Sequence, residues 1–253
     1  MRSPRLKQIN HGIWRIAFIA MLAACAAARG ADTSQFDNGN RFYEAGKFGD
    51  AKDAYQQMIR SGPVSANLYY NLGNTEWRLG NGGEAAADYE RALMLEPSHP
   101  EATANLQYVR DQTGAKTPDL TWWQSALTIL TANTASILVS ICGWLALFSI
   151  AVICIKPGRH MGIAALLTIS ILGAAYAGGT LWQSNAMAAR AVVIEKSVQA
   201  REAPADVAPV ADTLPAGSEV LAPEERGPWT YCTLPDGTRA WIPTEALERV
   251  KPA

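Results

Sequence analysis

A period of 34 residues in the N-terminal half is the feature that most limits the folds open to this chain. Six pairs of residues recur at that spacing: Gly39 and Gly73, Asn40 and Asn74, Gly46 and Gly80, Ala51 and Ala85, Tyr55 and Tyr89, and Pro63 and Pro97. A repeat of this length predicts helix pairs that bury their apolar faces against one another. The repeated glycines allow two helices to cross closely, and the prolines end the second helix of each pair.

The second copy, residues 69–97, reads YYNLGNTEWRLGNGGEAAADYERALMLEP and resembles the tetratricopeptide-repeat (TPR) family. This resemblance implies a TPR domain over residues 32–114, with repeats at 32–65 and 66–99 and a capping helix after them. Gly82 and Glu76 depart from the family pattern, because aromatic residues often occupy these two positions. We therefore expect the second repeat to be looser than the first.

The TPR resemblance also implies a peptide-binding groove lined by the first helix of each repeat. In this register the groove residues are Phe36, Asn40, Tyr43, Tyr70, Asn74 and Trp77. Asparagine amides beside aromatic rings favour an apolar or aromatic-rich peptide, because the amides can bind its backbone. The alternative interpretation places some of these aromatic side chains in the core of the repeats.

Residues 1–31 predict an export signal, since basic residues precede an apolar run that ends in small residues. Two processing routes remain open. An ordinary signal peptidase would cleave near Ala28. Alternatively, the tetrapeptide Leu-Ala-Ala-Cys that ends at Cys25 resembles a bacterial lipobox, and Cys25 would then carry a lipid.

Two uncharged apolar runs predict transmembrane helices at 133–155 and 161–183, because each run is long enough to cross a bilayer. The basic turn between them, residues 156–160, is expected in the cytoplasm by the positive-inside rule. Both soluble parts then lie outside, in the periplasm. Adjacent tryptophans in the segment 115–132 predict that it lies in the membrane interface. Neither run contains a charged residue, which argues against ion or solute transport.

Residues 190–250 predict a small all-β domain, because short β-rich runs alternate with turns rich in proline, glycine and aspartate. The segments around Trp229 and Trp241, the second of them Trp-Ile-Pro, resemble bacterial SH3-like (SH3b) domains. This resemblance implies a small barrel around which both tryptophans pack. Some SH3b domains bind peptidoglycan peptides.

Charge and chemistry argue against nucleic-acid binding and catalysis. Residues 32–114 carry seven basic and twelve acidic groups, a net charge of −5, whereas phosphate binding needs a basic surface. His11, His99 and His160 fall in separate parts of the chain, and the four cysteines are scattered. Zinc sites and nucleophilic triads need such groups together. We expect no catalytic residue, metal or cofactor, and we expect the acidic side chains of the repeats on solvated helix faces.

The sequence thus predicts a multidomain membrane protein with an all-α TPR solenoid, two transmembrane helices and a small all-β SH3-like barrel. This order of parts resembles the BatE family of bacterial aerotolerance operons over nearly the whole chain. The resemblance implies a non-enzymatic inner-membrane scaffold whose partners are von Willebrand factor A membrane proteins and a MoxR-type ATPase. The alternative function is a cell-envelope sensor or peptidoglycan-binding module that acts through the SH3-like domain.

Overall fold

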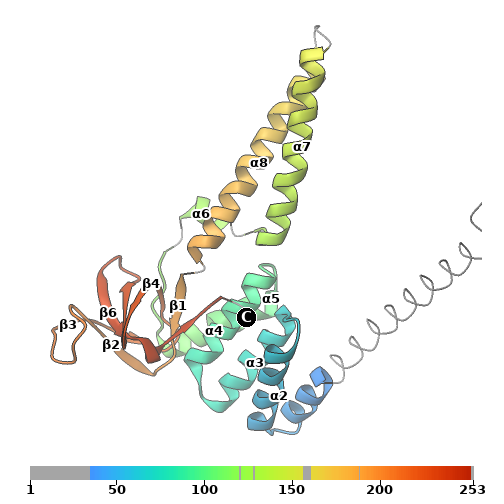
Figure 1. Cartoon of the computed structure of the whole chain (residues 1–253). Helices are drawn as coiled ribbons and strands as arrows, with labels where there is room; N and C mark the ends of the chain where they lie inside the picture. Colours follow the sequence, from blue (N-terminus) through green and yellow to red (C-terminus); the bar gives the residue numbers. More distant parts are fainter. Residues whose placement is uncertain (1–34, 120, 128, 156–160, 188, 252–253) are drawn as a thin grey trace, which may run out of the picture. The chain divides into compact units, whose positions relative to one another are not determined.

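The computed structural model describes residues 35–251 apart from 120, 128, 156–160 and 188. The chain divides after Val64 into two compact units, residues 1–64 and 65–253. The predicted export signal, Cys25 and the basic turn at 156–160 lie outside the described residues. Within the second unit fall one repeat, the apolar helices and the β-strands (Figure 1).

The first unit contains a helical hairpin formed by a helix over residues 35–44 and α2 (Phe48–Ser61). Gly46 lies in the turn between them with a positive φ of 72°, a conformation that glycine adopts without strain. The two helices cross closely at Gly39, where an added Cβ would lie 2.5 Å from the ring of Tyr55. The predicted role of this glycine is confirmed.

The second unit begins with three helices: α3 (Ala66–Leu79), α4 (Gly82–Leu95) and α5 (Pro100–Thr113). Their ends follow local sequence signals. The side chain of Ser65 accepts a hydrogen bond from the backbone N–H of Leu68 at 3.2 Å and caps α3. Gly80 ends α3 in the left-handed conformation, and Pro100 begins α5. Gly73 repeats the close crossing of the first unit, because an added Cβ would lie 2.8 Å from the ring of Tyr89.

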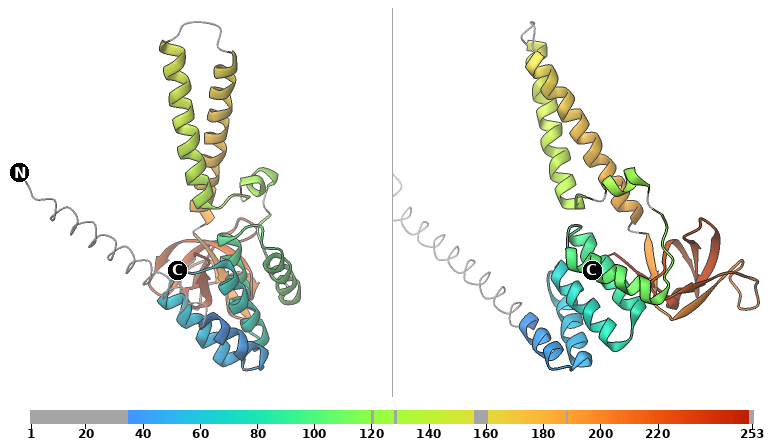
Figure 2. Two further views of the ribbon diagram at one scale, coloured as in Figure 1. Left: turned by 90° about the vertical axis from the view of Figure 1, so that its right-hand side faces the viewer. Right: turned by 180° about the vertical axis from the view of Figure 1, so that it is seen from behind.

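A hairpin of two long apolar helices follows, preceded by the short helix α6 (Trp122–Leu127). The long helices are α7 (Ala132–Ile155) and α8 (Met161–Met187), which lie side by side (Figures 1 and 2). Ala132–Ile155 and Met161–Ser184 are long and apolar enough to cross a membrane, with mean hydropathies of 2.6 and 1.8. An added Cβ at Gly173 would lie 2.9 Å from Sγ of Cys142, so small residues allow close packing here. The prediction of two long apolar helices is confirmed.

The C-terminal strands form one antiparallel sheet in the order β3-β2-β6-β5-β4-β1-β7. The strands are β1 (Arg190–Val193), β2 (Ser197–Arg201), β3 (Val210–Pro215), β4 (Glu219–Arg226), β5 (Trp229–Thr233), β6 (Arg239–Pro243) and β7 (Leu247–Arg249). The predicted closed barrel is wrong: β3 and β7 are the edges of the sheet and do not pair within its described strands. β7 has only three residues and pairs with β1, so it offers little length for closure.

The two faces of this sheet differ in composition. Small and aliphatic side chains fill the inner face, among them Val193, Leu214 and Ile242. Alternate residues of β5 and β6 point the other way, so that Tyr231 and Trp241 pair across the strands with ring centroids 4.9 Å apart. Both rings are half-buried and lie outside the core cluster. Trp229, which is also half-buried, points to the same outer face.

Candidate functional site

The predicted groove residues of the first unit pack partly within their own repeat. The hydroxyl of Tyr55 donates a hydrogen bond to Oδ1 of Asn40 at 2.7 Å. The ring centroid of Phe36 lies 6.1 Å from that of Tyr55, and Tyr43 contacts Phe48 edge to face at 5.3 Å. Each of the three groove side chains keeps part of its surface accessible.

The groove residues of the second unit show a similar arrangement. Oδ1 of Asn74 accepts hydrogen bonds from the Tyr89 hydroxyl at 2.7 Å and from the Asn105 amide at 2.8 Å. Tyr70 lies with its ring centroid 5.0 Å from that of His99, which caps α5. Trp77 contacts Tyr108 edge to face, with ring centroids 5.6 Å apart.

The groove as a whole remains a prediction, because it combines residues of both units. Within the second unit, however, the structure adds a residue that the sequence analysis missed. Tyr108 of α5 is 53% exposed beside Trp77. It follows Asn74 by 34 residues, as Asn74 follows Asn40. Extending the period into the capping helix would therefore have found it.

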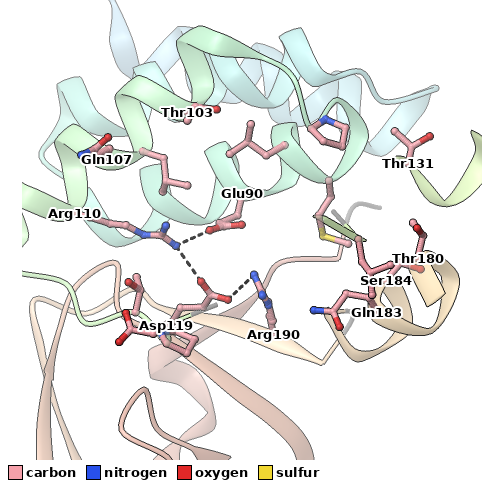
Figure 3. A pocket seen from close by; sticks show the side chains of 18 of the residues that line it. Glu90, Thr103, Gln107, Arg110, Asp119, Thr131, Thr180, Gln183, Ser184 and Arg190 are labelled. Atoms are coloured by element: carbon pink, nitrogen blue, oxygen red, sulfur yellow. Dashed lines mark hydrogen bonds and ion pairs between the residues drawn. The ribbon is translucent and has the colours of Figure 1, made fainter. Parts of the chain in front are cut away.

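The second repeat and the sheet meet at a network of buried charges. We call it the junction network; it consists of Glu90 on α4, Arg110 on α5, Arg190 on β1 and Glu219 on β4. Nη2 of Arg110 donates to Glu90 at 2.5 Å and to Glu219 at 3.1 Å (Figure 3). Nη1 of Arg190 lies 2.7 Å from the other carboxylate oxygen of Glu219. Two positive and two negative groups thus compensate one another at this junction.

Burial raises the pKa of the Glu219 carboxyl, and the nearby charge of Glu90 raises it further. Arg190 and Arg110 oppose this shift because they stabilise the carboxylate. The backbone adds a second connection at the same place. The N–H of Glu219 donates to the carbonyl of Lys116 at 2.9 Å, and the N–H of Lys116 donates to Oγ of Ser218 at 2.9 Å. The segment after α5 is therefore fixed to β4.

A second buried charge cluster lies between α4 and the C-terminal strand β7. Arg91 contacts Asp88 at 2.8 Å and Glu248 at 2.7 Å, and it donates to the carbonyl of Arg249 at 2.6 Å. Burial raises the pKa of the Asp88 carboxyl to about 8; Arg91 opposes this shift, whereas the charges of Glu248 and Glu76 add to it.

Glu76, Asp88 and Glu90 are all buried. The expectation that the acidic residues of the repeats lie on solvated helix faces is therefore wrong for these three. The physical reason for two of them is that the sheet covers one face of α4 and supplies arginines there. Glu76 instead accepts a hydrogen bond from the Asn81 amide at 2.8 Å, inside the repeat.

A cavity of about 690 Å³ lies beside the junction network. It is bordered by α4, α5, the segment after α5, the loop before α7, the last turns of α8 and the strands β1 and β4. Figure 3 shows Gln183 and Ser184 of α8 on the side of this space facing Arg190. Its volume falls within the ~300–1,000 Å³ typical of small-molecule sites. The cavity is therefore large enough for a ligand, and polar and apolar groups share its wall.

Comparison with known proteins identifies the helical region. The sequence model of the tetratricopeptide repeat matches residues 36–103. The probable biofilm formation methyltransferase WspC of Pseudomonas putida is 38% identical over 66 residues, which cover 26% of this chain and 16% of that protein. WspC of Pseudomonas aeruginosa is 36% identical over 72 residues, which cover 28% of this chain and 17% of that protein. The chain thus spans about a sixth of the length of the curated relatives it matches, and the similarity falls in the TPR region.

Residues 36–103 are therefore a TPR region, a class of structure that suggests protein–protein interaction.

Proposed function

We propose that this chain is a non-enzymatic adaptor, anchored in the bacterial inner membrane, that binds other proteins through its TPR region. The observation that carries this proposal is the presence, in one chain, of a TPR region at 36–103 and two helices long and apolar enough to cross a membrane. Helical repeats provide extended binding surfaces, and a membrane hairpin restricts them to partners at the same membrane.

The resemblance to the BatE family supports a more specific version of this function. Its partners would be von Willebrand factor A membrane proteins and an associated MoxR-type ATPase, and it would serve aerotolerance under oxidative stress. Both soluble parts would then lie in the periplasm. The predicted export signal and the basic turn at 156–160 support that topology, each on independent grounds.

Replacing Tyr108 with alanine should weaken partner binding by about thirtyfold, because truncating an interface aromatic typically costs about 2 kcal/mol. Tyr108 is the more exposed member of its pair with Trp77, so its loss should leave the repeat folded. Asn74→Ala is a poorer probe, since it would remove two hydrogen bonds inside the second unit. The measurement is co-purification of membrane proteins with the full chain, quantified against circular dichroism of the same sample.

Leu79→Ala is a matched control, because Leu79 is also exposed on the second repeat but lies about half a turn around α3 from Trp77. Equal binding by the wild type, Tyr108→Ala and Leu79→Ala would count against the TPR surface. A second candidate function, peptidoglycan binding, is favoured by the outer-face aromatics of the sheet. Retention of the chain on isolated sacculi, unaffected by Tyr108→Ala, would support that alternative.

The proposed topology predicts that alkaline phosphatase is active when fused after Thr113 and when fused after Ala253, since this enzyme folds only in the periplasm. A fusion within residues 156–160 should be inactive and serves as the internal control. Activity at only one of the two soluble parts would exclude the hairpin topology.

A further inference from the structure

The end of the hairpin nearest the cavity carries the residues that mark a membrane interface. Trp122 of α6 is 84% exposed and Trp182 of α8 is 64% exposed. α6 lies against the last turns of α8, because the Tyr176 hydroxyl donates to the carbonyl of Ala126 at 2.9 Å (Figures 1 and 2). Tryptophans gather where lipid headgroups meet water. If the hairpin spans the membrane as proposed above, this end lies at headgroup level.

The cavity reaches this level and changes character across its wall. Leu127 and Leu130 line it from the membrane side, and the junction network lines it from the soluble side. Thr180, Gln183 and Ser184 of α8 lie between these two parts. A ligand with a charged head and an apolar tail would match this gradient, whereas a fully polar solute would leave the leucines without apolar contact.

Two polar groups on the wall have unmet hydrogen-bonding capacity. The side chain of Gln183 is 6% exposed, and its amide has no hydrogen-bond partner among the described residues. Figure 3 shows Gln183 projecting from α8 toward the space beside Arg190. Nε of Arg110 is likewise buried without a hydrogen-bond partner in the described part of the chain. Buried donors are normally satisfied, so these two positions indicate a missing acceptor.

The charges on the wall favour a headgroup of both signs. Arg110 and Arg190 are compensated by Glu90 and Glu219, and two further carboxylates, Asp111 and Asp119, also line the cavity. Excess negative charge disfavours an anionic headgroup and attracts a compact ammonium group that can donate hydrogen bonds. A phosphate would accept from the Gln183 amide and from Nε of Arg110.

We propose that the cavity binds phosphatidylethanolamine, with the phosphate toward Gln183 and Arg110 and the ammonium toward Asp111 and Asp119. The acyl chains then leave past Leu127 and Leu130 into the bilayer. The bound lipid fills the space between the end of α8 and the second repeat. This inference rests on the membrane anchoring proposed above. Alkaline extraction of cell membranes tests that anchoring separately, because an integral protein stays in the pellet whether or not it binds this lipid.

The test uses the full chain, purified in a mild detergent and stripped of lipid, with native mass spectrometry as the readout. Dioleoyl phosphatidylethanolamine, phosphatidylcholine and phosphatidylglycerol are added at equal concentrations. The wild type should bind the ethanolamine lipid most tightly. Gln183→Leu keeps the volume of the side chain but removes the amide, and it should weaken that binding about tenfold, the effect of losing one hydrogen bond to a charged group.

Gln112→Leu is the matched control, because Gln112 is exposed on α5 and does not line the cavity. If Gln183→Leu fails to fold, Asp119→Asn replaces it; this exposed substitution should reduce the preference for the ethanolamine lipid over the glycerol lipid. Equal binding of all three lipids, or an unchanged preference in Gln183→Leu or its replacement, would overturn the proposal. Soluble glycerophosphoethanolamine should compete poorly, and competition as strong as that of the lipid would overturn the membrane source of the ligand.

Discussion

Replacing Gly83 with alanine should lower the free energy of unfolding of the second unit by about 3 kcal/mol and loosen the sheet from α4, an effect at the upper end of those caused by overpacking. An added Cβ would lie 2.4 Å from Cα of Ile194 and 2.5 Å from the carbonyl oxygen of Val193. Both are backbone atoms, so no side-chain rotation can relieve the clash. α4 and β1 would have to separate.

Thermal unfolding of the full chain in detergent, followed by circular dichroism, measures this loss, and limited proteolysis reports release of the sheet. Gly49→Ala is the control, since Gly49 lies in α2 with no atom within 4 Å of its added Cβ. That substitution should stabilise its helix by up to about 1 kcal/mol. Similar melting temperatures for Gly83→Ala and the wild type would show that the sheet does not pack on α4 as described.

The second large effect concerns Asp88 and depends on pH. Burial raises the pKa of its carboxyl to about 8 in the folded chain from an ordinary value of 3.8. The folded state therefore holds a proton that the unfolded state releases, and stability must fall as pH rises between these two values. From about pH 5 to about pH 8 the loss is at most about 4 kcal/mol, since one pKa unit corresponds to about 1.4 kcal/mol.

Asp88→Asn keeps the size of the side chain without its titration, so its stability should depend much less on pH over this range. Denaturant unfolding of both proteins at several pH values measures the difference in slope. Asp53→Asn, an exposed substitution in α2, should leave the slope of the wild type unchanged. Parallel curves for the wild type and Asp88→Asn would refute the assignment of the proton to Asp88.

The parts of this fold that repeat locally could be predicted from sequence. Gly39 and Gly73 indicated the helix crossings because the partner of each lies 16 residues away, at Tyr55 and Tyr89. The long apolar helices were equally clear, because an uncharged apolar run of more than about 20 residues is typical of a helix that can cross a bilayer. Tyr108 was also within reach through the same period.

The junction could not be predicted in this way. Gly83 and Asp88 are explained only by strands that begin more than 100 residues later in the chain. A buried carboxylate and an exposed one have the same letter, and only the approach of Arg91 and Glu248 distinguishes them here. The open sheet was missed for a related reason: strand order depends on long-range pairing, which turn signals do not encode.

The covering of α4 by the sheet also limits how this protein can change in evolution. Repeat arrays usually lengthen by duplication, with each new unit stacking on the exposed flank of the previous one. In this chain β1 and β7 already pack against α4, and Gly83 leaves no space between them. Duplication after the second repeat would expel the sheet and uncover the buried carboxylates. Longer relatives of this protein should therefore gain their additional repeats before residue 35, on the N-terminal side of the array.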